Sequence, residues 1–378
     1  MWITHKRIHR LETNTIMNAK QRTLPEIMSN RMEVTLSRRG FLRAGLTGAA
    51  GLVVARDVSG REGKTSGAEA REPVVYTVTG TIPAADMGFT LPHEHVMVDW
   101  NGGDGKSRER YDPSEVVAVI KPYLMEIREL GVRTFVDCTP PYLGRDVLVL
   151  RELALATGLN IITNTGLYEK KYAPPFAFEA SQEEITDMFV REIVEGIEGT
   201  GIRACFIKIG VSNEGPVTPN DEKIVTAACR AHHETGATIN SHTFQGVSAL
   251  RQIEILEREK VDPAAFTYVH ACFEPDVSYT IEAAKRGVWI EFDSIRPDRA
   301  DFHVERIFTM LDRGFEDQLL LSQDRGWYRI GEEKGGTIND YSYLPRDFLP
   351  LLKTKGVTND LIDKLTITNP ARSYALRV

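Results

Sequence analysis

Short β-rich runs alternate with amphipathic helical patterns eight times along the chain, and this alternation constrains the fold more than any other feature. The stretches between the runs place apolar residues three and four positions apart, as in 113–130 and 181–197. The runs cover residues 89–91, 134–139, 160–165, 204–210, 238–242, 267–271, 288–292 and 318–322. Eight strand–helix units predict an α/β fold, a (β/α)8 barrel of the TIM type with parallel strands.

A doubly wound sheet is the alternative arrangement for the same alternation. Such a sheet usually carries a glycine-rich turn after its first strand, but here the first run is followed by Pro92-His93-Glu94-His95. Glycines that would end helices stand directly before four of the runs, at Gly131, Gly158, Gly236 and Gly287. The segment 74–82 is expected to form a hairpin that closes the barrel floor.

Charge is unevenly divided along the 378 residues. The chain has 46 basic and 53 acidic residues, a formal charge of −7, but residues 1–70 hold 12 of the basic and 6 of the acidic ones. Residues 71–378 therefore hold 34 basic and 47 acidic residues, a net −13. An acidic body of this size argues against non-specific binding of nucleic acid. Hydrophobic and charged fractions of 42% and 26% exclude a disordered chain or a many-helix membrane protein.

The basic first segment, residues 1–70, is interpreted as an export leader rather than a domain. Arg38 and Arg39 are adjacent, and the apolar run that follows at 41–55 is too short to span a bilayer comfortably. A paired arginine before a weak apolar run resembles a twin-arginine signal, with Met32 as an alternative start. The resemblance implies a periplasmic protein, in which residues 71–378 form a single barrel domain without stable membrane insertion. The alternative is an uncleaved amphipathic anchor or a flexible tail.

Histidines gather at the C-terminal ends of the expected strands, where barrel enzymes build their sites. His93 and His95 follow the first run, His242 ends the fifth, and His270 lies at the end of the sixth. Alternate residues of a strand point the same way, so His93 and His95 face the mouth together and Glu94 points into the wall. Imidazole is a ligand suited to zinc, so four such histidines predict a metal site rather than core packing. The other histidines of the body lie on expected helices and are expected to be solvated: His232, His233 and His303.

Lys208 and Asp324 lie at the ends of two further strands. Lys208 stands between apolar neighbours, Phe206-Ile207 before it and Ile209 after it, and a buried ammonium is costly unless it is paired. Either it is a structural lysine bonded to a neighbouring carboxylate such as Asp137, or it is a neutral amine that adds carbon dioxide. The second reaction would give an anionic carbamate able to hold two metals. Asp324 either caps the following loop or accepts the proton of a metal-bound water.

Further motifs accompany these residues in order along 73–378. They are Thr-Leu-Pro-His-Glu-His at 90–95, Leu-Gly-Arg-Asp at 143–146, Thr-Gly-Leu-Tyr at 165–168, Ser-His at 241–242 and Asn-Pro-Ala-Arg at 369–372. Together with Lys208, His270 and Asp324, they resemble the phosphotriesterase family of the amidohydrolase superfamily. The resemblance implies a (β/α)8 barrel that binds two divalent metal ions, usually Zn2+, with Co2+ or Mn2+ as alternatives.

The resemblance also implies a role for each of the six residues at the strand ends. The more buried metal would be held by His93, His95 and Asp324, and the more exposed one by His242 and His270. Lys208, as N6-carboxylysine, would bridge both metals together with a hydroxide.

The implied activity is hydrolysis of an ester-type bond in a small-molecule substrate by attack of that hydroxide. The first hypothesis is a lactone or carboxylic ester, with some phosphotriesterase activity. The second is an organophosphate or phosphodiester, and the third is a non-catalytic exported binding protein on the same barrel. An Asp-Arg-Tyr-Gly type segment, found in lactonase-like members after the seventh strand, is absent from 292–297. The family often forms homodimers, and Phe176 and Phe178 would serve such an interface or pack locally.

Three residues are candidates for contact with the substrate, each with a plainer alternative. Tyr168 stands near where lactonase-like members place a tyrosine against the lactone, or it packs on the prolines of its loop. Arg296 is either a substrate clamp or an ordinary surface charge. Trp327 either walls an apolar pocket with Tyr328 or covers the barrel top.

Overall fold

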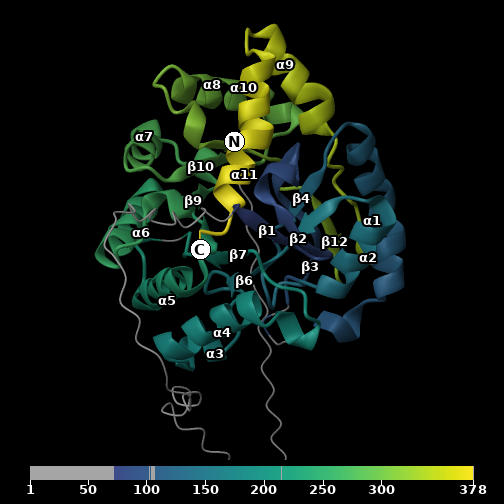
Figure 1. The fold of residues 1–378 in the computed structure, drawn as a ribbon, viewed down its shortest axis with the longest axis vertical. Helices are drawn as coiled ribbons and strands as arrows, with labels where there is room; N and C mark the ends of the chain where they lie inside the picture. Colours follow the sequence, from purple (N-terminus) through teal and green to yellow (C-terminus); the bar gives the residue numbers. More distant parts are fainter. Residues whose placement is uncertain (1–71, 102, 104–106, 214, 378) are drawn as a thin grey trace, which may run out of the picture. The chain divides into compact units, whose positions relative to one another are not determined.

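Eight parallel strands form a closed ring in the computed structural model, which describes residues 72–101, 103, 107–213 and 215–377 (Figure 1). In chain order the ring consists of β3 (Thr90–Val98), β4 (Thr134–Asp137), β5 and β6 (Asn160–Ile162 and Asn164–Leu167), β7 (Phe206–Gly210), β8 (Thr238–His242), β9 (Phe266–Val269), β10 (Trp289–Phe292) and β11 (Leu319–Leu321). Each strand pairs in parallel with the next, and the third position is shared by β5, which pairs with β4, and β6, which pairs with β7. The predicted (β/α)8 barrel is confirmed.

The ring closes where the end of β11 runs beside β3. The Ser322 hydroxyl donates to the carbonyl oxygen of His93 at 2.9 Å and accepts from its backbone N–H at 2.9 Å. The backbone N–H of Asp324 donates to the same carbonyl at 3.1 Å. A further strand, β12 (Gly326–Arg329), continues this seam and pairs in parallel with the C-terminal half of β3. The chain after β11 is thereby fixed against the two histidines of β3.

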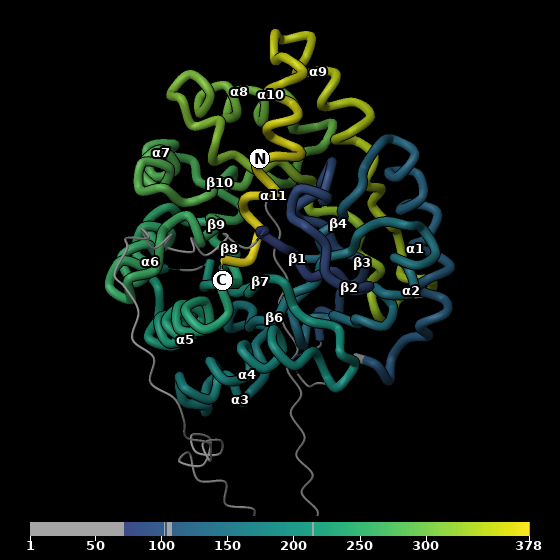
Figure 2. Tube along the Cα trace, viewed as in Figure 1, coloured from purple at the N-terminus to yellow at the C-terminus, as the bar shows by residue number. Residues whose placement is uncertain are grey.

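Helices follow the strands and cover the ring, as the trace in Figure 2 shows in chain order. They are α1 (Pro113–Glu129), α2 (Val147–Thr157), α3 (Phe176–Glu179), α4 (Gln182–Val194), α5 (Pro219–Thr235), α6 (Gly246–Arg258), α7 (Val277–Lys285), α8 (Ala300–Leu311), α9 (Leu349–Thr354), α10 (Asn359–Asp363) and α11 (Asn369–Tyr374). Local sequence sets several ends: Ser181 and Glu184 form a capping box before α4, and Gly236 ends α5 in the left-handed conformation. The predicted helices at 113–130 and 181–197 correspond to α1 and α4.

A two-stranded hairpin, β1 (Val74–Thr77) and β2 (Gly80–Pro83), lies at the N-terminal side of the ring, as predicted. Its Val75 packs in a separate apolar cluster with Phe206, the first residue of β7, and with Tyr374 of α11. Backbone hydrogen bonds join Val78 to Ile161 of β5 and Leu376 to Val74. The hairpin and the C-terminal segment therefore close the floor and leave the opposite end for a site.

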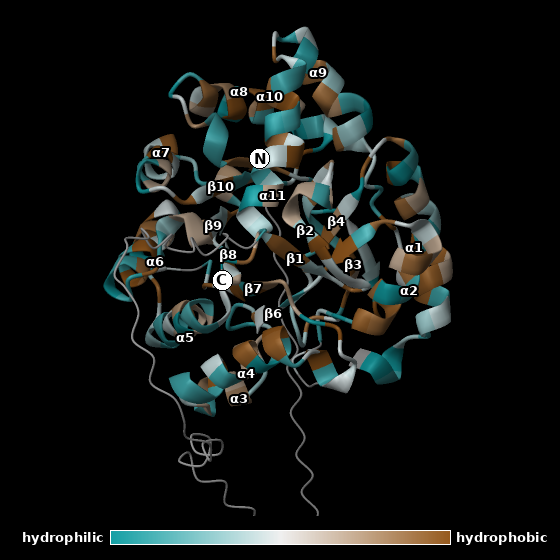
Figure 3. Cartoon of the chain, in the orientation of Figure 1, coloured by the Kyte–Doolittle hydropathy of each residue, from teal (hydrophilic) through white to brown (hydrophobic). Residues whose placement is uncertain are grey.

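Apolar residues are concentrated on the strands and on the inner faces of the helices, while hydrophilic residues cover outward faces such as that of α5 (Figure 3). Two histidines depart from expectation: His232 and His303 were expected to be solvated but are buried, whereas His233 is exposed. His303 lies on the inner side of α8, where its Nε2 donates to the Ser294 carbonyl at 3.2 Å. The helical pattern identified α8 but not which of its polar residues faces the barrel.

The predicted leader, with Arg38, Arg39 and the alternative start Met32, lies outside the described residues. In the part of the chain that is described, no helix has the length and apolarity needed to cross a membrane. Of the two aromatic residues considered for a homodimer interface, Phe178 is 40% exposed. Phe176 is half-buried and its ring packs edge-on to Tyr142 at 5.4 Å. The homodimer stays a prediction.

Candidate metal centre

Five of the six predicted ligands are buried together at the C-terminal end of the ring. His93 and His95 come from β3, Lys208 from β7, and His242 from the end of β8, while His270 directly follows β9. The ring centroids of His93 lie 5.3 Å from those of His95 and 5.1 Å from those of His270. The His242 and His270 centroids are 4.5 Å apart. Side chains alternate along β3, and β7 and β8 pair in parallel register. The barrel thus brings His93 and His270, which are 177 positions apart in the sequence, into one cluster.

Asp324 completes one group of potential ligands with the two histidines of β3. Its Oδ1 lies 3.2 Å from Nε2 of His95 and 3.9 Å from Nε2 of His93. One ligand atom from each of the three residues lies within 4.8 Å of the others, which suits a single metal ion. Burial lowers the pKa of both imidazoles, and for His93 the charge of Lys208 adds to this effect, so both rings stay neutral and keep a lone pair for a metal. Burial would raise the pKa of Asp324, but the nearby His95 and the positive charge of Lys208 outweigh burial and lower that pKa.

His242 and His270, the predicted ligands of the second metal, are differently placed. Nδ1 of His270 is bonded to Oδ1 of Asp293 at 2.8 Å, which leaves Nε2 available. Nδ1 of His242 lies 2.8 Å from the Tyr168 hydroxyl and its Nε2 lies 2.9 Å from Nδ2 of Asn213. A second group with close ligand atoms consists of His93, His270 and Asp293. We assign Asp293 to holding His270 rather than to a metal, because it also accepts from the His270 backbone N–H at 3.0 Å.

The environment of Lys208 is the strongest indication that this cluster binds a group other than amino acids. The side chain is 1% exposed, and Nζ has no hydrogen-bond partner among the described residues. The structural alternative, a bond to Asp137, is not observed: the Asp137 carboxylate accepts instead from the Val96 backbone at 2.8 Å and the Thr139 hydroxyl at 3.3 Å. Oε2 of Glu291 and Oδ1 of Asp324 are also buried, and neither accepts a hydrogen bond from a residue that the structure describes. A metal centre bridged by a modified Lys208 would satisfy this cluster.

Comparison with known proteins places the chain in a family. The Phosphotriesterase family profile matches residues 73–374. A phosphotriesterase homology protein of Mycobacterium tuberculosis is 33% identical over 319 residues, covering 80% of this chain and 98% of that protein. An aryldialkylphosphatase of Saccharolobus solfataricus is 29% identical over 309 residues, covering 78% and 97%. A crystal structure of a mutant PTE-like lactonase of Deinococcus radiodurans superposes with a TM-score of 0.73 at 32% identity, covering 79% of this chain and 99% of that chain.

The chain belongs to the phosphotriesterase family. The sequence resemblance is thereby confirmed for the family and the barrel, whereas the roles of individual residues rest on the geometry described above. In this phosphotriesterase-family chain the six predicted ligands converge, and one of the two predicted groupings, His93, His95 and Asp324, already has close ligand atoms.

Sequence reasoning missed the residues that orient these ligands. Oε1 of Glu291 lies 2.5 Å from Nδ1 of His93, and the Thr139 hydroxyl lies 2.8 Å from Nδ1 of His95. With Asp293 on His270, three of the four histidines are held through Nδ1, which leaves Nε2 for a metal. Burial and the neighbouring Asp293 charge raise the pKa of Glu291 well above its ordinary value. A signal existed, because Glu291 stands in an apolar strand as Lys208 does.

Glu94 lies in the barrel wall, as expected, and its carboxylate organises the loop that carries Asp324. One oxygen lies 2.8 Å from the Ser322 hydroxyl oxygen and accepts from the Gln323 backbone N–H at 3.1 Å. The other accepts from the Arg325 backbone N–H at 2.8 Å. The residues on both sides of Asp324 are therefore tied to β3. Burial raises the pKa of Glu94 to about 8, although these donors oppose the shift.

Two of the three predicted substrate residues lie against the ligand cluster. Tyr168 contacts His242, and Trp327 stacks on the His95 ring with centroids 3.9 Å apart and donates from Nε1 to the Asp324 carbonyl at 3.0 Å. Trp100, which sequence reasoning missed, is 44% exposed and stacks on Trp327 at 5.5 Å. These rings form an aromatic wall beside the six candidate ligands.

Arg296, the third candidate, is oriented differently. Its Nε forms an ion pair with Asp298 at 3.0 Å. Among the described residues, no hydrogen bond or ion pair joins Arg296 to the six predicted ligands. This arrangement fits the surface-charge alternative better than the clamp.

Proposed function

We propose that the protein is a metal-dependent hydrolase that acts on a lactone or carboxylic ester, with some activity on phosphotriesters. The observation that carries this proposal is the unpartnered Nζ of buried Lys208 in the middle of four histidines and Asp324. Belonging to the phosphotriesterase family supports hydrolysis. The lactonase and aryldialkylphosphatase named among the similar proteins support both substrate classes without deciding between them.

The residues present fit two divalent ions, with Zn2+ first and Co2+ or Mn2+ as alternatives. His93, His95 and Asp324 would hold one ion, His242 and His270 the other, and N6-carboxylysine at Lys208 would bridge them. Neutral imidazoles and carboxylates are the donors that such ions prefer. When bound, two divalent ions act as Lewis acids and bring the pKa of water from about 15.7 towards neutrality.

The side chains of the protein then divide the remaining work. Asp324 keeps its carboxylate ionised, so it can take a proton from the attacking water and return it to the leaving group. The Tyr168 hydroxyl, beside His242, is placed to donate to the carbonyl or phosphoryl oxygen of the substrate. Burial raises the pKa of Tyr168 well above its ordinary value, so this hydroxyl remains a donor at neutral pH. Trp327 and Trp100 would exclude water on one side.

Substitution of Lys208 tests the proposal most directly. Lys208→Met places an apolar side chain of similar length in the buried site, and this side chain cannot form a carbamate. We expect loss of most turnover and a fall in bound metal from about two equivalents per chain, with the fold retained by circular dichroism. Growth with isotopically labelled bicarbonate should give a carbamate signal in the wild-type protein and none in the variant. Wild-type activity in metal-replete Lys208→Met would contradict the bridging role.

A substrate panel decides between the hypotheses. We expect the highest kcat/KM on a lactone or an aryl ester and a lower value on a phosphotriester, measured with zinc-, cobalt- and manganese-loaded protein. A higher value on the phosphotriester or a phosphodiester would favour the second hypothesis. A protein that binds ligands without metal and hydrolyses nothing would be the binding protein of the third hypothesis.

A further inference from the structure

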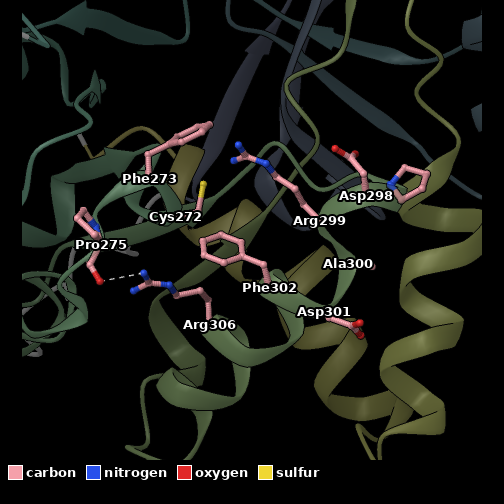
Figure 4. Close-up of a pocket in the computed structure, with 10 residues that line it drawn as sticks. Cys272, Phe273, Pro275, Asp298, Arg299, Ala300, Asp301, Phe302 and Arg306 are labelled. Carbon is pink, nitrogen blue, oxygen red and sulfur yellow. Dashed lines mark hydrogen bonds between the residues drawn. The ribbon is translucent and has the colours of Figure 1, made fainter. Parts of the chain in front are cut away.

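A cavity of about 580 Å³ is lined by residues that follow β9 and β10, among them Cys272, two positions after His270 (Figure 4). Phe273 and Pro275 line it from the segment after β9. Arg299, Phe302 and Arg306 line it from the loop after β10 and from α8. None of these residues was singled out from the sequence, and none is among the proposed metal ligands.

Phe273 connects the cavity with the metal centre. Its ring centroid lies 6.0 Å from that of His270, and the guanidinium carbon of Arg299 lies 5.3 Å from the same Phe273 ring on the cavity side. The Phe244 ring packs on both aromatic neighbours, 4.8 Å from Phe273 and 5.4 Å from His270. A small molecule that reached from the metal centre into the cavity would therefore pass along aromatic rings.

Two of the arginines that line the cavity, Arg299 and Arg306, form no ion pair among the described residues. Among the described residues no ion pair involves Arg299, whose guanidinium lies over the face of Phe273. Arg306 donates to the Pro275 carbonyl at 3.1 Å and lies over the Phe302 ring, again without an ion pair within the described part of the chain. Asp298, which also borders the cavity, is 69% exposed and pairs with Arg296. Asp301, the other carboxylate that lines the cavity, forms no ion pair with either arginine among the described residues. The Arg299 guanidinium therefore keeps N–H donors for a ligand.

We propose that this cavity binds an anionic group of the substrate, a carboxylate, sulfonate or phosphate, through Arg299 while the scissile bond lies at the metal centre. The guanidinium presents a planar fork of donors that matches an oxyanion, and the phenyl rings suit the apolar chain between the anion and the bond that is cut. The inference rests on the proposed hydrolase function and narrows its substrates to acidic esters or lactones. Arg299, rather than Arg296, would therefore hold the substrate.

The test compares two esters that differ only in charge: mono-p-nitrophenyl glutarate and the p-nitrophenyl ester of glutaramic acid. We expect kcat/KM to be roughly tenfold higher for the acid, mainly through a lower KM, which is the effect of one hydrogen-bonded charge pair. Longer diacid esters vary the spacing, and esters that end in sulfonate or phosphonate identify the preferred anion. Equal kcat/KM for every charged and neutral pair would overturn the proposal.

Arg299→Gln should bring the ratio of the two kcat/KM values close to one, and Arg299→Glu should invert it. The matched control is Arg313→Gln, because Arg313 is an exposed arginine just beyond the other end of α8, and its guanidinium donates to the Thr309 carbonyl. This control should keep the wild-type ratio. A ratio that survives in Arg299→Gln would place the anion elsewhere and end the proposal.

The experiment distinguishes failure of the hydrolase proposal from failure of the proposed anion site. If neither ester is hydrolysed by the metal-loaded protein, the hydrolase proposal fails, and the same two compounds are then titrated calorimetrically. Tighter binding of the acid by the wild type, lost in Arg299→Gln, would still support the anion site. Equal binding of the acid and the amide, or binding of the acid that is unchanged in Arg299→Gln, would overturn it.

Discussion

Buried ionisable side chains distinguish this barrel at the scale of single residues. Glu94, Lys208, Glu291 and Asp293 are each at most 1% exposed, and a buried charge is costly unless other groups compensate it. The burial of Lys208 and Glu291 can be predicted, because both residues interrupt apolar strands. The residues that they contact cannot be predicted, since Glu291 contacts His93 across 198 residues of sequence. The sequence therefore predicts which residues have a special role better than it predicts what they contact.

Glu94→Gln tests whether the wall carboxylate positions the Asp324 loop. Above the Glu94 pKa of about 8, where the carboxylate is ionised, the amide would present a donor to one of the backbone N–H groups that the carboxylate satisfies, so the loop should loosen. We expect kcat or metal affinity to fall roughly 10–100-fold, as for other partners that orient metal ligands. Both are read from titration of the metal-depleted protein with zinc. Glu305→Gln on α8 is the control, and equal behaviour of the two variants would show that Glu94 only fills space.

At the scale of elements, the strands that carry the site were predicted with unequal success. The expected strand at 238–242 matches β8, Thr238–His242. The first strand was expected at 89–91 but runs over Thr90–Val98, because its polar His93, Glu94 and His95 were interpreted as the end of the strand. The third was expected to be continuous, yet it divides between β5 and β6, which pair with different neighbours. Polar residues that a site requires thus obscure the pattern that predicts secondary structure.

Gly166 on β6 permits the close approach of β7 at Lys208. A Cβ at this position, where φ is 148°, would lie 1.7 Å from the carbonyl oxygen of Lys208. We expect Gly166→Ala to lower the free energy of unfolding by about 3 kcal/mol or more and to weaken metal binding. Gly80→Ala is a matched control, since φ there is 144° and nothing lies within 4 Å of the added Cβ. Equal loss in both variants would show that backbone strain alone, and not the contact with β7, is responsible.

For the whole molecule, acid should weaken the attachment of α8 through His303. Burial lowers the pKa of His303 from 6.5 to about 4. Between these values the unfolded chain binds a proton that the folded chain does not, so the free energy of unfolding falls as the pH drops from 6.5 towards 4. The contribution reaches about 3 kcal/mol at the acid end. Urea unfolding of His303→Gln should lose stability less steeply over this range than the wild type, whereas the exposed His233→Gln should follow the wild type.

The division of charge between residues 1–70 and 71–378 concerns the molecule as a whole and leads to its last prediction. We propose that the segment around Arg38 and Arg39 directs export of the already folded, metal-loaded barrel to the periplasm. Lys keeps the charge but not the guanidinium, so Arg38→Lys with Arg39→Lys should leave the protein in the cytoplasm with its metal content unchanged. Arg43→Lys, a few residues along the same segment, is the control and should be exported. Cell fractionation with immunodetection measures both, and periplasmic recovery of the double variant would show that the paired arginines are not an export signal.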